Sequence, residues 1–180
     1  MKSRGPEDRL ILYIDGASRG NPGRAGAGIW ITNGGGEKIS EVSRYLGHKT
    51  NNQAEYWALL LGLKEAKRLG GEALQIFTDS ELVERQIKGI YRVKDSNLKG
   101  LHKTVLQNLK TFSSFEIESI PREENKEADR LANQAIRRRI ANEKRKGGGE
   151  GEQMVAPPEF TQSGKSGGEE SPSSTGQGGP

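Results

Sequence analysis

Residues 8–15 read DRLILYID, a run rich in strand-forming residues that stops at Gly16. Such a run, ended by a turn residue, predicts a buried strand. A second run, ALQIFTD at residues 73–79, predicts another, so that Asp15 and Asp79 both close strands. A carboxylate aimed towards a core is costly unless a positive partner neutralises it, and no buried Lys or Arg is evident nearby. A divalent metal ion, which prefers oxygen ligands, is the leading candidate for that partner.

The other predicted elements place these two strands in a mixed sheet. Two strands joined by the hairpin signal NGGG follow the first one, and helices alternate with strands after that. The resulting order, βββαβααβα, predicts an α/β fold in which helices cover the sheet. Residues 16–26, GASRGNPGRAG, are expected to form a loop because of their turn signals. The remaining expected elements are strands 27–32, 38–46 and 115–120, and helices 50–69, 80–89, 97–110 (capped by Asn97) and 125–146 (capped by Asn125).

Glu55 lies on the apolar stripe of the helix that is expected to begin at Thr50. Steps of four, seven, eleven and fourteen residues from Glu55 reach Leu59, Gly62, Ala66 and Leu69. The carboxylate is therefore predicted to face the interior rather than solvent. Each of the other acids has a simpler explanation, and these stay open at this stage. Asp79 can cap a helix, Asp129 can complement a helix dipole, and Asp15 can begin a turn.

The four acids are nevertheless expected to converge. Ligands of α/β sheets collect at the carboxyl ends of parallel strands, where Asp15 and Asp79 lie. If these strands are neighbours, a spacing of ~4.8 Å brings both carboxylates within reach of one ion. Glu55 and Asp129 then need only point from their helices into the same crevice. Four carboxylates suit two Mg²⁺ ions roughly 4 Å apart, the arrangement that hydrolyses phosphodiesters.

Composition divides the chain into a foldable part and a tail. Residues 147–180 hold ten of the 25 glycines and four of the seven prolines, with no hydrophobic periodicity. We expect this tail to be disordered, residues 1–8 to be flexible, and residues 9–146 to form one domain. The whole chain carries a net charge of +4 and the tail −4, so residues 1–146 carry +8. A domain with this charge favours polyanions such as nucleic acid, although simple solubility explains it equally well.

Other features restrict the protein's setting. The chain has no cysteine, which excludes disulfides and thiolate metal sites. No apolar stretch approaches the ~20 residues that span a membrane, and the start lacks the apolar region of a signal peptide. We therefore expect a cytoplasmic protein that contacts no membrane. No obligate protein partner is evident, and a monomer is expected.

Four segments together resemble the signatures of the ribonuclease H type 1 (ribonuclease HI) family: YIDGASRGNPG, TNNQAEYWALLLGL, IFTDS and ENKEADRLAN. They occur in the family's order, and each contains one of the acids. The resemblance implies a ribonuclease H-like fold with a five-stranded mixed sheet ordered 3-2-1-4-5. It also implies metal-dependent endonucleolytic cleavage of the RNA strand of RNA–DNA hybrids, leaving 5′-phosphate and 3′-hydroxyl ends. Mg²⁺ is the expected cofactor, at two ions per site, with Mn²⁺ as a substitute.

The resemblance also assigns roles to individual residues. Asp15 would bridge both ions, Glu55 and Asp79 would complete one site, and Asp129 would hold the other ion. Polar residues near the first two acids would sense the 2′-hydroxyl that distinguishes RNA from DNA. Thr50 would grip a phosphate of the DNA strand or serve as a plain helix cap. The substrate-binding set implied in this way is Gly16, Ser18, Asn21, Thr50, Asn51, Asn52 and Gln53.

Two departures from the family pattern are visible. The loop before Asp129 lacks the His found in many members, and Arg122 is the expected accessory residue there. Arginine stays protonated, so its role would be electrostatic rather than that of a base. The basic protrusion of other members is also missing, as in an archaeal and bacterial branch of the family. Substrate contacts are then expected from Lys88, Arg92 and Lys94, and the basic run within residues 137–146 could also contribute. A solvated basic helix end is the simpler explanation of that run, because cations favour helix C-termini.

Two alternatives to this hydrolase remain at this stage. One is a domain of the same fold that binds nucleic acid with little or no cleavage. The other is a nuclease that also cuts double-stranded RNA or single ribonucleotides embedded in DNA. The presence of all four acids favours an enzyme over the binding module.

Overall fold

A computed structural model of the 180-residue chain describes residues 9–146. The expectations for residues 1–8 and for the tail, 147–180, lie outside this range. No helix within the described part is long and apolar enough to cross a membrane. In chain order the elements are β1 (Arg9–Gly20), β2 (Gly23–Thr32), β3 (Lys38–Lys49), α1 (Asn51–Arg68), β4 (Ala73–Thr78), α2 (Glu81–Ile87), α3 (Ser96–Leu109), β5 (Ser114–Ser119), a short 3₁₀ helix (Arg122–Glu124) and α4 (Lys126–Lys146).

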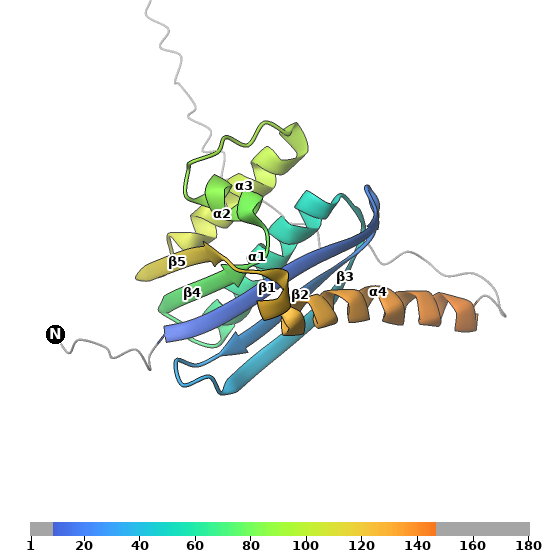
Figure 1. Ribbon diagram of the computed structural model, residues 1–180, viewed down its shortest axis with the longest axis horizontal. Coiled ribbons are helices and arrows are strands. Elements are labelled where there is room, and N and C mark those ends of the chain that lie inside the picture. The colour runs from blue at the N-terminus through green and yellow to red at the C-terminus, as the bar shows by residue number, and fades with distance from the viewer. Residues whose placement is uncertain (1–8, 147–180) are drawn as a thin grey trace, which may run out of the picture.

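The five strands form one mixed sheet in the order β3-β2-β1-β4-β5, which confirms the predicted fold (Figure 1). The central strand β1 pairs antiparallel with β2 and parallel with β4. Strand β4 in turn pairs parallel with β5. Because β1 and β4 are parallel neighbours paired up to Ile14 and Thr78, the next residues, Asp15 and Asp79, lie side by side.

Helix α1 covers one face of the sheet through very close packing. Gly62 lies against the side chains of β1 and β2, where an added Cβ would come within 3.2 Å of Ile14 and 3.5 Å of Ile29. Leu12, Ile14 and Ile29 have no exposed surface, so this layer is the centre of the core. Helix α3 packs against α1. This face therefore holds α1 rigidly, including its first turn.

Helix α4 packs on the opposite face, against β2 and its neighbours. Two glycines of β2 permit the contact, because an added Cβ at Gly28 would lie 1.9 Å from the Ala128 carbonyl oxygen and one at Gly26 would lie 2.3 Å from that of Ala132. A residue with any side chain there would push the helix away from the sheet. The first turn of α4 is thereby held beside the middle of β1.

Residues 16–26, predicted as a loop, form most of a β-hairpin instead. Strand β1 continues to Gly20 and β2 begins at Gly23, with Gly16 opposite Ala27 and Gly20 opposite Gly23. Only Asn21 and Pro22, joined by a cis peptide, separate the two strands. The turn signals were misleading because cross-strand hydrogen bonds satisfy the backbone of these small residues.

Two helix caps also differ from prediction. Asp95, rather than Asn97, caps α3 by accepting a hydrogen bond from the Asn97 backbone N–H at 2.8 Å. Asn125 precedes α4, but its side chain donates to the Ile14 carbonyl instead of capping the helix. By contrast, Thr50 caps α1 as predicted.

Candidate active site

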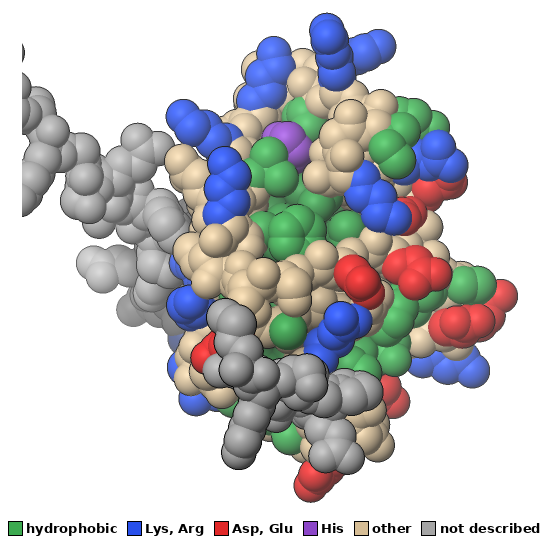
Figure 2. Space-filling view, turned by 90° about the vertical axis from the view of Figure 1, so that its left-hand side faces the viewer, with side chains coloured by type: hydrophobic (Ala, Val, Ile, Leu, Met, Phe, Trp, Pro, Cys, Tyr) green, Lys and Arg blue, Asp and Glu red, His purple; other side chains and the backbone are tan. Residues whose placement is uncertain are grey.

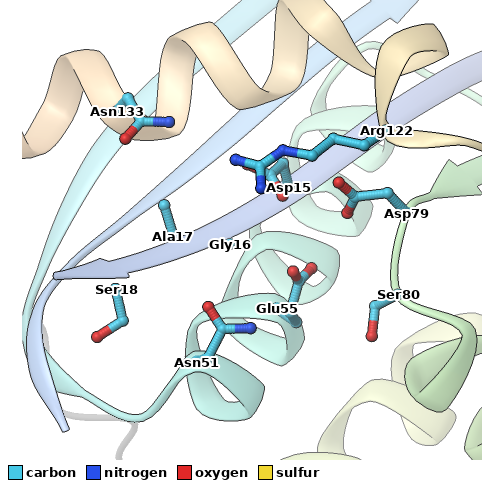
Figure 3. A pocket seen from close by; sticks show the side chains of 10 residues that line it. All are labelled: Asp15, Gly16, Ala17, Ser18, Asn51, Glu55, Asp79, Ser80, Arg122 and Asn133. Carbon is cyan, nitrogen blue, oxygen red and sulfur yellow. The ribbon is translucent and has the colours of Figure 1, made fainter. Parts of the chain in front are cut away.

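A polar crevice opens where β1 loses one of its two neighbours. The pairing of β4 with β1 ends at Ile14 and Thr78, whereas β1 continues along β2 as far as Gly20. From Asp15 onward one edge of β1 is therefore left uncovered by the sheet. The crevice along this edge has a volume of about 480 Å³ (Figure 3). It is lined by Asp15, Gly16, Ala17, Ser18, Asn51, Glu55, Asp79, Ser80, Arg122 and Asn133.

Three acids from three elements converge in this crevice. Asp15 lies on β1, Asp79 directly follows β4, and Glu55 lies in the second turn of α1. One carboxylate oxygen from each lies within 4.8 Å of the other two. The side chain of Ser80 caps α2 by accepting from the Val83 N–H at 3.3 Å, so the Asp79 carboxylate is not used as a cap. The sheet and α1 thus direct three acids to one point.

Gly16 permits the close approach of α1 that places Glu55. A Cβ at this position would lie 2.2 Å from the Ala54 carbonyl carbon and from the Glu55 nitrogen. The Gly16 backbone also hydrogen-bonds the Glu55 carboxylate. Any larger residue here would force the first turn of α1, and Glu55 with it, away from Asp15.

The cluster is electrostatically strained without a cation. Burial, followed by repulsion from Asp79 and Asp129, raises the pKa of Asp15 from 3.8 to about 7. Burial, followed by repulsion from Asp15 and Asp79, raises the pKa of Glu55 well above its ordinary value. Within the described residues, the buried Oε2 atom of Glu55 has no hydrogen-bond partner. Clustered oxygens with an unused buried acceptor are consistent with a site for a divalent cation.

Asp129, the fourth predicted acid, is not among the three whose oxygens lie within 4.8 Å of one another, although its charge helps to raise the pKa of Asp15. It lies in the first turn of α4, and its Oδ1 accepts a hydrogen bond from Nη2 of Arg122 at 2.6 Å. The Asp129 side chain is 29% exposed and that of Arg122 is 73% exposed. The Arg122 guanidinium extends over Asp15 in the crevice (Figure 3). Its charge also lowers the pKa of both Asp15 and Glu55, opposing their burial.

Asn125 connects these two groups of acids. Its Nδ2 donates to the carbonyl oxygen of Ile14 at 2.8 Å, and the residue is only 1% exposed. This bond occupies the Ile14 carbonyl immediately before Asp15. The start of α4, with Asp129, is therefore held directly against the strand that carries Asp15.

Only some of the expected substrate-binding residues line the crevice. Gly16, Ser18 and Asn51 line it, whereas Asn21, Thr50, Asn52 and Gln53 do not. The Asn21 side chain accepts from the Asn51 N–H at 3.1 Å, which joins the hairpin turn to α1. Thr50 and Gln53 hydrogen-bond one another in a reciprocal helix cap. Ser18 donates to the Lys49 carbonyl at 2.9 Å.

Two polar residues at the crevice were not predicted, namely Ser80 and Asn133. Asn133 follows Asp129 by four residues on α4, and its side chain donates to the Asp129 carbonyl at 3.0 Å. Residues four apart share one face of a helix, so this spacing could have revealed Asn133. Ser80 gave no signal beyond its place next to Asp79.

The expected basic contacts near α2 are partly neutralised. Lys88 forms an ion pair with Glu84, whereas Arg92 and Lys94 are exposed in the loop between α2 and α3. Lys and Arg side chains stand out at the top of the molecule, at the height of α2 and α3, while acidic ones gather lower on the right (Figure 2). A polyanion can therefore approach this end of the molecule more easily than the acidic side.

Comparison with known proteins relates this arrangement to characterised ones. The sequence profile of a family described as reverse transcriptase-like matches residues 13–135. A ribonuclease HI from Halobacterium salinarum is 39% identical over 128 residues, which cover 71% of this chain and 64% of that protein. A bifunctional protein of Mycobacterium tuberculosis is 37% identical over 130 residues, covering 71% of this chain and 35% of that protein. The chain thus spans less than two thirds of the length of these relatives.

A solved structure extends the likeness to three dimensions. The crystal structure of LC11-RNase H1 in complex with an RNA/DNA hybrid superimposes with a TM-score of 0.70 at 38% identity. The match covers 73% of this chain and 99% of that one. Nearly the whole of that fold is therefore represented within this chain.

Proposed function

Because this chain belongs to the ribonuclease H type 1 family, we propose that it is an endoribonuclease that cuts the RNA strand of RNA–DNA hybrids. The products would carry 5′-phosphate and 3′-hydroxyl ends. The proposal depends mainly on one observation. Asp15, Glu55 and Asp79 bring carboxylate oxygens within 4.8 Å of one another at an open strand edge. A relative of the same fold was crystallised with an RNA/DNA hybrid, which supports the choice of substrate.

In the proposed mechanism the carboxylates would hold Mg²⁺ or Mn²⁺, which would supply the charge stabilisation for cleavage at the scissile phosphate. Asp15, Glu55 and Asp79 would hold one ion, and Asp129 together with Asp15 would hold a second. Bound ions of this kind lower the pKa of an attacking water and stabilise the departing 3′ oxygen. Gly16 lets α1 lie close enough to β1 to place Glu55 beside Asp15. Asn125 holds the start of α4, and with it Asp129, against β1. Arg122, which keeps its charge, attracts the phosphate electrostatically.

Recognition of RNA would come from the start of α1 and the hairpin beside it. Asn51 and Asn52 are exposed, so their amides can hydrogen-bond 2′-hydroxyls in the minor groove. Asn21 positions the Asn51 backbone through the bond between them. Gln53 and Thr50 stiffen the same turn, and the Thr50 N-cap lies where a DNA phosphate would dock. Ser18 stands on the uncovered edge of β1, within the crevice.

The deciding experiment compares cleavage of end-labelled RNA–DNA hybrid, double-stranded RNA and double-stranded DNA. The protein is assayed with Mg²⁺, with Mn²⁺ and with EDTA. We expect hybrid cleavage with either metal and none with EDTA or in Asp79→Asn. Glu118→Gln removes an exposed acid from β5 and should retain activity. Hybrid binding without metal-dependent cleavage would overturn the assignment, and equal cleavage of double-stranded RNA would widen the substrate class.

The monomeric state and the cytoplasmic location expected from the sequence are part of this proposal. Asp15, Glu55 and Asp79 line one crevice of a single chain, and the charge of Asp129 in the same chain acts on Asp15, so one chain would suffice for the chemistry. Size-exclusion chromatography with light scattering, on protein that cleaves hybrid, should give the mass of one chain.

A further inference from the structure

The basic run at the end of α4 does not form one uniform patch. At about 100° per residue, Arg137 lies about 40° around the helix from Asn133, and Lys144 about 20°. Asn133 lines the crevice one turn after Asp129. The flank of α4 that brings Asn133 to the crevice therefore continues as Arg137 and Lys144. We call these two cations the crevice-side pair.

The other basic residues of the run face elsewhere. Arg138 and Arg145 lie about 140° and 120° from Asn133, on the flank turned away from the crevice. Arg139 stacks over Tyr45 of β3 and forms an ion pair with Glu143 at 2.9 Å. The run thus separates into the crevice-side pair, an outer pair (Arg138 and Arg145), Arg139, which packs on the sheet, and Lys146, the last residue of α4.

The crevice-side pair is available for a ligand. Both side chains are exposed, and within residues 9–146 neither Arg137 nor Lys144 has an ion pair or a hydrogen-bonded side-chain partner. Exposed cations of this kind bind a polyanion by neutralising phosphates and releasing counterions. Nearer the acids, Arg122 is held by Asp129. The crevice-side pair would therefore supply positive charge further along the same groove.

The spacing of the pair also suits a nucleic acid strand. Seven residues of helix correspond to about 10.5 Å, which equals the axial rise of about three nucleotides in one strand of a duplex, at roughly 3.4 Å each. Helix α4 runs from the crevice towards the β1–β2 hairpin, where Arg24 meets Glu143 at 2.8 Å. A strand that leaves the acids along the open edge of β1 would follow this flank.

We propose that Arg137 and Lys144 form a phosphate-binding subsite that holds the nucleic acid beyond the acidic cluster. This inference rests on the proposed function, because it takes the strand in the crevice to be part of a hybrid. Helix α4 would then provide part of the substrate binding that the short loop between α2 and α3 does not provide. The affinity for the hybrid should therefore fall when cations are removed from the crevice-side flank of α4, and not when the same charge is removed from its other flank.

The test measures binding of a fluorescent 20-base-pair hybrid to the full chain by anisotropy across a salt series. Asp79→Asn is the background, in Mg²⁺, so that the hybrid stays intact. Arg137→Ala with Lys144→Ala is compared with Arg138→Ala with Arg145→Ala, which removes the same charge from the same helix. The crevice-side double variant should bind about 5–20-fold more weakly, with a log–log salt slope reduced by about 1.4–1.8. The outer pair should change affinity less than about twofold.

Equal losses in the two double variants, or no loss in either, would overturn the subsite. Circular dichroism checks that each variant is folded, and a second pair with Gln in place of Ala repeats the comparison with a longer polar side chain. Failure of the proposed function gives a different result, since the unmodified chain would then not cleave the hybrid at all. A chain that cleaves hybrid but shows equal losses would contradict only the role of Arg137 and Lys144.

Discussion

The carboxylates at this crevice occupy two different environments. Asp15 and Glu55 are 5% and 4% exposed, Asp79 lies beside them, and the pKa values of Asp15 and Glu55 are raised by burial and mutual repulsion. Asp129 stands at the rim with its charge matched by Arg122. The comparison teaches that burial, and not residue type, decides which acids require an external cation. The inner cluster needs a metal to offset its own repulsion, whereas at the rim Arg122 already offsets part of the charge of Asp129.

The largest expected effect is on catalysis and separates the two environments directly. Glu55→Gln should reduce Mg²⁺-dependent hybrid cleavage by roughly 10³-fold, because it removes a buried negative charge worth several kcal/mol of charge stabilisation at the ion. Asp129→Asn should cost less, because the Asp129 side chain is partly solvated and paired with Arg122, so the loss of its charge matters less. Initial rates at saturating hybrid measure both. Losses of equal size would contradict the division into an inner cluster and a rim pair.

The next effect concerns stability and pH in the absence of metal. Folded Asp15 keeps its proton up to about pH 7, whereas its ordinary pKa is 3.8. Between these values the folded state binds more protons, so the free energy of unfolding should fall as pH rises from about 4 to 7. Asp15→Asn removes this penalty and should stabilise the metal-free protein at pH 7 by about 3 kcal/mol. Thermal unfolding in EDTA across this range measures the change.

Two controls accompany that measurement. Asp129→Asn should show no comparable gain, because its carboxylate is partly solvated and paired. Added Mg²⁺ should stabilise the unmodified protein by mass action and leave Asp15→Asn nearly unchanged. An Asp15→Asn variant that unfolds at the same temperature as the parent in EDTA would show that the cluster is not strained.

A smaller effect is expected at the residue that joins the two environments. Asn125→Ala leaves the buried Ile14 carbonyl without its donor and should lower the free energy of unfolding by about 1–3 kcal/mol. Asn133→Ala, at a partly exposed position on α4, should change the free energy of unfolding by less than about 0.5 kcal/mol. Chemical denaturation gives both values. Similar values for the two variants would remove Asn125 as the connection between β1 and α4.

The smallest effect on stability is expected at Arg122. The exposed Arg122–Asp129 pair should contribute only about 0–1 kcal/mol, so Arg122→Ala should unfold almost normally. Its removal should raise the pKa of Asp15 and Glu55 further, since Arg122 lowers both. Metal binding and turnover should then require a higher pH, and Arg122→Lys should restore most of the loss. An unchanged pH–rate profile in Arg122→Ala would remove this residue from the mechanism.

Local patterns predicted much of the fold. Strand β4 occupies residues 73–78 as expected from ALQIFT, and α1 begins after its Thr50 cap and ends before Gly70. The prediction failed where long-range pairing overrides local signals. Residues 16–20 carry turn residues, yet they extend β1 because β2 lies beside them. Asn125 was predicted to cap a helix, yet its side-chain amide donates a hydrogen bond to the buried carbonyl oxygen of Ile14.

Buried strands that carry Asp15 and precede Asp79, and the inward-facing Glu55, were predictable from the sequence, because these features depend on apolar runs and helical period within short segments. Only the tertiary structure decided that Asp129 pairs with Arg122 and that Asn125 holds Ile14, 111 residues away. It also decided that one flank of α4 continues the crevice. These contacts arise when close packing at Gly16, Gly26 and Gly28 brings distant segments together. No local pattern contains that information, since the partners meet only after the chain has folded.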